Sequence, residues 1–279
     1  MPQTKGTHLN APLLGSHRDG SLWGRFLENV PVEKLNPAMY MSWSMDRLVD
    51  GIAVAASNSL TGMTFGQGSG TTNGTLNTSN DHVSLSTTST DNDEILMVVG
   101  LGGRAAFRMN QPNRPITWFF EGNITAVAGA HVFLGMADID TVTAAGPLVA
   151  GTGALADTRD LFGFHWQQAT NPTPTVYSKR AAVATVSAPM TSCQLVDNVD
   201  FRCAIIVNQN TMRWLFQTQT SGGITAATSQ GILSHTAATT FMGPTICIQN
   251  HGGVAAKGVN VFRNWAAQRR VDNAFTNWH

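Results

Sequence analysis

Four aspartates have the spacing that comes closest to a chemical site. Asp138 and Asp140 form a D-x-D pair on one side of an expected strand, and Asp157 and Asp160 follow nearby. Their carboxylate oxygens could chelate a hard cation such as calcium. Loop aspartates more often cap turns, because their side chains bond the backbone two residues on. We favour turn capping and therefore expect no metal ion and no cofactor.

The chain offers few groups for catalysis. A glycosidase needs two carboxylates at a fixed separation, and Glu121 is the only glutamate after Glu94. His131 and His165 lie in apolar runs, where a hydrogen-bonded core histidine is more common than a ligand or a base. No serine stands in a nucleophile elbow. We expect no catalytic residue and no enzymatic activity.

Three cysteines, Cys193, Cys203 and Cys247, cannot all pair within one chain. Their spacing contains no Cys-x-x-Cys and no Cys/His ligand set. We interpret them as small hydrophobic residues buried in strands.

The surface expected from the composition is nearly neutral. Only 12% of the residues are charged, with 17 basic against 17 acidic side chains, whereas about 25% is usual. Nucleic acid and anionic membranes call for a concentrated positive patch, so neither is an expected partner. Thirteen arginines against four lysines favour protein interfaces, because a guanidinium is the more weakly hydrated cation. The chain is therefore expected to be a homo-oligomer.

The elements that would position these residues are strands. Between residue 94 and the C-terminus, short apolar and β-branched runs follow one another with no convincing helix between them, at 116–120, 131–136, 161–166, 201–207 and 212–216. Such runs, bounded by Gly, Asn, Asp or Pro, are typical of an antiparallel sandwich. Residues 94–279 are therefore predicted to form an all-β sandwich or jelly roll with a short C-terminal tail.

The clearest predicted hairpin turns at 208–210. On the strand that leaves this turn, Met212, Trp214 and Phe216 share one face and Arg213 and Leu215 the other. Trp118 and Trp166 lie in similar runs. We expect all three tryptophans to be core residues.

Residues 1–50 are predicted to be an extended arm, with one short helix over 37–45. The arm carries Leu22, Trp23, Phe26 and Leu27, which could pack on their own domain or dock on a neighbouring subunit. These four residues are the candidate partner contacts.

Residues 51–93 are rich in Thr, Ser, Asn and Gly, which is typical of a linker or of polar β-hairpins. We favour hairpins, because threonine suits strands and Asn73-Gly74 is a two-residue turn signal.

The succession of runs at 117–121, 133–138, 161–166 and 200–205, followed by the hairpin to 212–216, resembles the concanavalin A-like jelly roll of bacteriophage structural proteins. The resemblance covers about residues 94–265 through short motifs. It implies a capsid decoration (cement) protein on the exterior of the virion. Its partners would be the major capsid protein and further copies of itself, with a trimer favoured. The chain lacks the paired-Glu motif of the fold's glycanases.

The sequence therefore leaves two alternative functions for this chain. The favoured one is structural: an oligomer stabilises the phage head, with the arm lying across neighbouring capsid subunits. The alternative is a tail or fibre module that binds a carbohydrate receptor through aromatic and Asn/Asp side chains.

Overall fold

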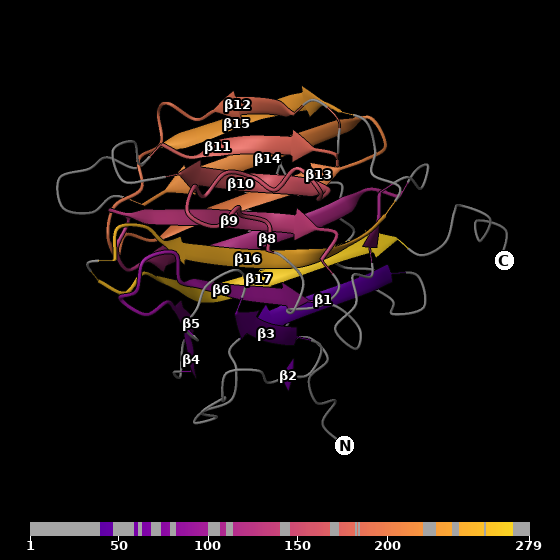
Figure 1. Cartoon of the computed structure of the whole chain (residues 1–279). Helices are drawn as coiled ribbons and strands as arrows, with labels where there is room; N and C mark the ends of the chain where they lie inside the picture. The colour runs from indigo at the N-terminus through magenta and orange to yellow at the C-terminus, as the bar shows by residue number, and fades with distance from the viewer. Residues whose placement is uncertain are drawn as a thin grey trace, which may run out of the picture.

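The computed structural model describes residues 40–46, 59–60, 63–67, 74–78, 82–99, 107–109, 114–139, 146–167, 173–181, 183, 185–219, 227–235, 240–253 and 255–269. Within these ranges the chain forms strands and no helix, and hence no helix that could cross a membrane. The strands make two antiparallel sheets that stack face to face (Figure 1). The predicted all-β antiparallel sandwich is confirmed.

The first sheet has eight strands. Its order is β15 (Thr228–Ser234), β14 (Thr211–Thr218), β13 (Phe201–Val207), β8 (Ile116–Ile124), β17 (Gly258–Arg269), β5 (Val83–Ser86) and β4 (Thr75–Thr78). The eighth strand, β1 (Tyr40–Asp46), pairs with the second half of β17, beyond the part of β17 that pairs with β5.

The second sheet has nine strands. Its order is β12 (Val186–Pro189), β11 (Thr175–Lys179), β10 (Leu161–Gln167), β9 (Ala130–Ala137), β16 (Phe241–Asn250), β6 (Glu94–Val99), β3 (Met63–Gln67) and β2 (Ser59–Leu60). The ninth strand, β7 (Phe107–Arg108), pairs with β16.

The core lies between the two sheets and is lined by alternate residues of the long central strands, among them β8, β9, β10, β13 and β14. Trp118, Trp166 and Trp214 are all buried in it, as predicted from the apolar runs. The hairpin of β13 and β14 pairs Val207 with Met212, so its turn lies at 208–210 as predicted. Because side chains alternate across a strand, every second residue of β13 and β14 faces away from the core.

The outer face of the nine-stranded sheet is covered by the chain itself. Phe133, Leu161 and Cys247 form a second apolar cluster there, against Leu148 and Leu155 from the segment that precedes β10. Cys193 and Cys203 are also buried, and none of the three cysteines forms a disulfide. The cysteines are thus small buried side chains, as expected, but Cys193 lies in the turn after β12 and not in a strand.

The prediction of a short helix over 37–45 is wrong for residues 40–45, because residues 40–46 form the strand β1. Residues 37–39 lie outside the described residues. All seven residues of β1 pair with β17, so the backbone bonds of a sheet replace those of a helix. The sequence carried a signal for this: Met41, Trp43 and Met45 alternate with Ser42 and Ser44, which is the period of a strand and not of a helix.

Residues 51–93 contribute strands to both sheets. β4 pairs with β5, and β2 pairs with β3, which continues onto β6. Strands are therefore found N-terminal to residue 94. The turn signal Asn73-Gly74 stands just before β4, and the hairpin of β4 and β5 turns instead between residues 78 and 83.

Candidate recognition face

A row of polar side chains crosses the outer face of the eight-stranded sheet, which we define as the face turned away from the nine-stranded sheet. It runs through Asn77, Ser84, Asn260, Asn123 and Asp200, which come from β4, β5, β17, β8 and the residue before β13. Asn260 Nδ2 donates to Asn123 Oδ1 at 2.9 Å, and Asn123 Nδ2 donates to Asp200 Oδ1 at 2.8 Å. We call these five residues the asparagine row.

The next row on the same face is charged. Arg263 Nη1 lies 3.3 Å from Glu121 Oε2, and Arg202 stands opposite Glu121 on β13. Arg202 Nε donates to Gln217 Oε1 at 2.8 Å, and Gln217 Nε2 donates to Thr228 Oγ1 at 3.3 Å. A solvent-exposed ion pair adds only about 0–1 kcal/mol to stability. We call these five residues the arginine row.

A bulge in β17 brings these charges together. The pairing of β17 with β8 shifts between Val261 and Arg263, so that Arg263 and not Phe262 stands opposite Glu121. An extra residue in one strand re-aims the side chains that follow it. The arginine row therefore depends on a backbone irregularity.

An aromatic pair flanks the arginine row. Trp265 stands opposite Phe119, and their rings stack with centroids 5.8 Å apart and planes 18° apart. They are 6% and 5% exposed, and Leu215 two strands away is fully buried. The outer face thus carries the asparagine row, the arginine row and, beside the arginine row, an apolar strip of Phe119, Trp265 and Leu215.

The polar rows carry groups with fixed hydrogen-bonding geometry. An asparagine amide offers a donor and an acceptor side by side, a carboxylate offers acceptors, and a guanidinium offers a planar fork of donors. Asn260, Asp200, Arg202 and Gln217 are partly exposed. Their mutual hydrogen bonds hold these groups in one orientation, which suits recognition of a ligand that carries several hydroxyls.

His131 and His165, the two histidines named from the sequence, lie elsewhere, on the covered outer face of the nine-stranded sheet. His165 Nε2 donates to the carbonyl oxygen of Gly153 at 2.8 Å, so His165 is a buried, hydrogen-bonded histidine of the kind the sequence predicts. The ring of His131 lies 4.9 Å from that of His251. Burial lowers the pKa of both His131 and His165 to about 4.

Gly153 permits this packing. Its φ of +62° is in the left-handed region, and a Cβ atom there would lie 2.1 Å from Cγ of His131. A side chain at this position is therefore excluded by conformation and by space.

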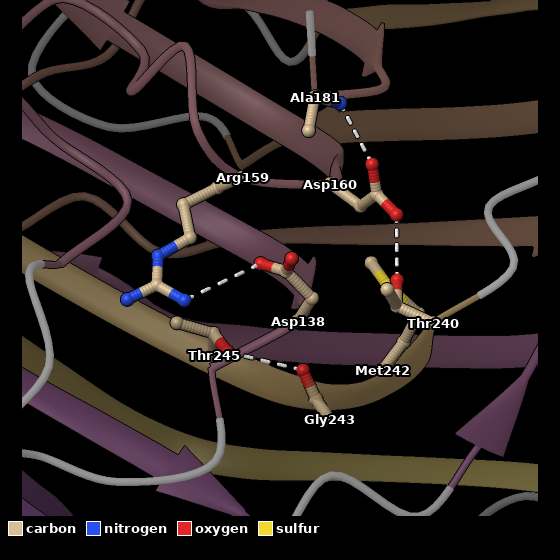
Figure 2. A network of polar contacts seen from close by, with 8 residues as sticks. All are labelled: Asp138, Arg159, Asp160, Ala181, Thr240, Met242, Gly243 and Thr245. Atoms are coloured by element: carbon tan, nitrogen blue, oxygen red, sulfur yellow. Dashed lines mark hydrogen bonds and ion pairs between the residues drawn. The ribbon is translucent and has the colours of Figure 1, made fainter.

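Figure 2 shows two of the aspartates that the sequence singles out, and each contacts protein groups. Asp160 accepts from the backbone N–H of Ala181 at 2.7 Å and from Thr240 Oγ1 at 2.5 Å. Asp138 lies 4.0 Å from Arg159, and burial raises the pKa of Asp138.

Asp157 is the third of the four aspartates named from the sequence, and its Oδ1 lies 2.5 Å from Nζ of Lys179. These contacts reach residues at least 21 positions away in the sequence, so the aspartates connect separate segments and do not make the local turn caps that the sequence favoured. Among the described residues, no group of three or more His, Cys, Asp or Glu is placed to hold a metal ion. Asp140 and the candidate partner contacts Leu22, Trp23, Phe26 and Leu27 lie outside the described residues.

Sequence reasoning missed the residues of the two polar rows. The signal was present within β8, where Glu121 and Asn123 alternate with core positions, and again at Asn260 in β17. That these positions form rows across the sheet follows from strand order and register, which no local pattern gives.

Comparison with known proteins gives the fold. No protein-family model matches the chain, and no curated protein matches its sequence. Among solved structures, the peanut lectin with a nonapeptide aligns with a TM-score of 0.56 at 10% identity, covering 84% of this chain and 99% of the lectin. The basic winged bean lectin with Tn-antigen aligns at 0.54 and 10% identity, covering 83% and 100%.

Arcelin-5, a lectin-like defense protein from Phaseolus vulgaris, aligns at 0.54 and 7% identity, covering 84% of this chain and 100% of its own. The concanavalin A-like sandwich expected from the sequence is thus shown as a fold.

Proposed function

We propose that this protein is a non-enzymatic carbohydrate-binding module that holds a saccharide against the outer face of its eight-stranded sheet. The observation that carries the proposal is the asparagine row. Its amides and carboxylate are aligned across the strands and fixed by the bonds from Asn260 to Asn123 and from Asn123 to Asp200. A saccharide presents hydroxyls that both donate and accept, which is what such a row can satisfy.

The strands explain why this face suits a ligand of that kind. Side chains of one row are spaced by the distance between neighbouring strands, about 4.8 Å, and hydroxyl groups on a saccharide can contact more than one of them. The arginine row adds planar donors next to it, from Arg202 and Arg263. The lectin-like fold supports the same proposal.

The non-enzymatic part rests on how the carboxylates of this face are engaged. Glu121 contacts Arg263, and Asp200 accepts from Asn123. Both carboxylates therefore position neighbouring side chains of the face, and the proposal assigns neither of them to hydrolysis.

The decoration role predicted from the sequence remains the second candidate. β1 pairs along β17 over seven residues, and the four candidate partner contacts precede it in the sequence. Under this proposal Leu22, Trp23, Phe26 and Leu27 would contact a major capsid protein on the virion exterior, with the chain as a homo-oligomer. Removal of residues 1–39 would then abolish attachment to empty phage heads and leave the fold intact.

The saccharide proposal is tested by screening the full chain against an array of mono- and oligosaccharides and titrating the best-bound saccharide by calorimetry. We expect Asn260→Ala to weaken binding about five- to thirtyfold, since it removes hydrogen bonds worth about 1–2 kcal/mol. The matched control is Asn210→Ala, an exposed asparagine in the turn at the opposite end of β13. Absence of saccharide binding, or equal weakening by both variants, would contradict the proposal.

A further inference from the structure

β15 is the outermost strand of the eight-stranded sheet. It pairs with β14 on one side, and Figure 1 shows it at the border of the sandwich, next to β12 of the other sheet. Four of its seven side chains are exposed and only Leu233 is buried. Ile232 is 65% exposed, more than any other large hydrophobic residue that the structure describes.

The other sheet borders that the structure describes carry at least one protective feature that β15 lacks. β4 and β12 have four residues each, β12 ends in Pro189, and β2 has two residues. β1 has seven residues like β15, but it ends in the charged Asp46. Short edge strands, prolines and charges are the usual protection of an open edge, because its free N–H and C=O groups otherwise pair with another chain. β15 is seven residues long and contains neither proline nor a charged residue.

The surroundings of Ile232 extend the apolar edge onto the outer face. Ile232 stands opposite Arg213 of β14, which in turn stands opposite Ile206 of β13. Ile206 is partly exposed. Ile232 at the border of the sheet and Ile206 two strands inward expose apolar surface to water. Covering this surface with another protein chain would be favourable, because it removes apolar area from water.

We propose that β15 docks on β15 of a second copy of this chain, in antiparallel pairing. A second copy fits because the strand is uncharged, so identical edges approach without repulsion, and because the whole chain has a net charge of zero. Two-fold pairing about Gly231 aligns all seven residues, with Thr228 opposite Ser234 of the second copy. Isologous contacts of this kind close into a dimer.

The two-fold axis of such a pair is perpendicular to the sheet, so the outer faces of both copies lie on the same side. The asparagine rows would then form one bivalent surface. The proposal itself does not depend on what that surface binds. One strand pair buries less than the roughly 800 Å² per partner of a standard interface, so association should depend on protein concentration.

The first test is sedimentation of the full chain over a series of concentrations. We expect a reversible dimer whose dissociation constant rises at least tenfold in Ile232→Lys. The matched control is Val149→Lys, at a hydrophobic residue that is 42% exposed in a loop of the other sheet; it should dimerise like the natural chain. Circular dichroism checks that both variants are folded.

The second test fixes the register. Thr228→Cys/Ser234→Cys should give a covalent dimer on oxidation, because each cysteine meets the other residue's position in the second copy. Within one chain these positions lie about 20 Å apart, beyond the roughly 6 Å between Cα atoms that a disulfide allows. The single variants should not cross-link, and the natural cysteines are buried. A monomer at all concentrations, an oligomer that survives Ile232→Lys, or no covalent dimer would overturn the proposal.

Discussion

His131 and His165 hold the chain segment around Gly153 against the nine-stranded sheet. His165 donates to the Gly153 carbonyl, and the His131 ring packs where a side chain of residue 153 would otherwise be. Both rings are buried among other side chains. Charging either ring inside the fold costs its desolvation, so the folded protein keeps both histidines neutral at neutral pH.

The stability of the protein should therefore depend on pH. Burial lowers the pKa of His131 and His165 to about 4, while an unfolded chain has histidines with pKa near 6.5. The unfolded state therefore binds protons more readily as pH falls. The stability that each neutral, buried histidine contributes is fully present above about pH 6.5 and is lost as the pH falls from there to about 4, and for His165 this loss is about 3 kcal/mol.

Urea denaturation at pH 7.5 and pH 4.5 measures this loss. His165→Gln keeps an amide donor for the Gly153 carbonyl but cannot titrate, so the drop in unfolding free energy should be smaller in this variant than in the natural chain. An equal drop in both would show that His165 does not carry the effect.

At the scale of elements, Gln268 joins the two sheets. It lies in β17, and its side-chain amide donates to the carbonyl oxygens of Arg108 and Arg114 and accepts from the backbone N–H of Arg108. Arg108 belongs to β7, in the other sheet. The guanidinium of Arg108 also lies 4.7 Å from the centre of the half-exposed Phe241 ring.

Gln268→Leu keeps the volume of this side chain and removes its hydrogen bonds. We expect a loss of about 1–3 kcal/mol in unfolding free energy, because backbone groups of β7 lose their partner near the core. Faster amide exchange at Arg108 would locate the effect. Gln217→Leu, on the partly exposed outer face, is the control, and an equal loss in both variants would argue against a link between the sheets.

The strands differ in how well the sequence predicts them. Strands could be predicted where large apolar residues either alternate with polar ones or occupy both faces, as in β8, β9, β10, β13 and β14. The strand β1 was misread as helix, since a short apolar run fits either period until pairing with β17 decides it. The bulge at residues 261–263 was not predictable, because it is a property of two strands together. Without the bulge, Phe262 and not Arg263 would stand opposite Glu121, and the arginine row would lack Arg263.

On the scale of the whole molecule, the scarcity of charge has a consequence for assembly. With 17 basic and 17 acidic side chains, no net repulsion keeps copies apart. The scarcity of charge therefore favoured an oligomer, and the resemblance to capsid decoration proteins implied a trimer. The structure supplies an open edge at β15 that suits a two-fold contact, so a trimer would have to use another surface.

Hydrogen exchange of the full chain, with and without the best-bound saccharide of the array, would locate the saccharide that we propose binds the outer face of the eight-stranded sheet. We expect slower exchange in the segments that contain Asn123, Asp200 and Asn260. Protection confined to the chain that covers the nine-stranded sheet, around residues 146–157, would contradict the assignment of the site.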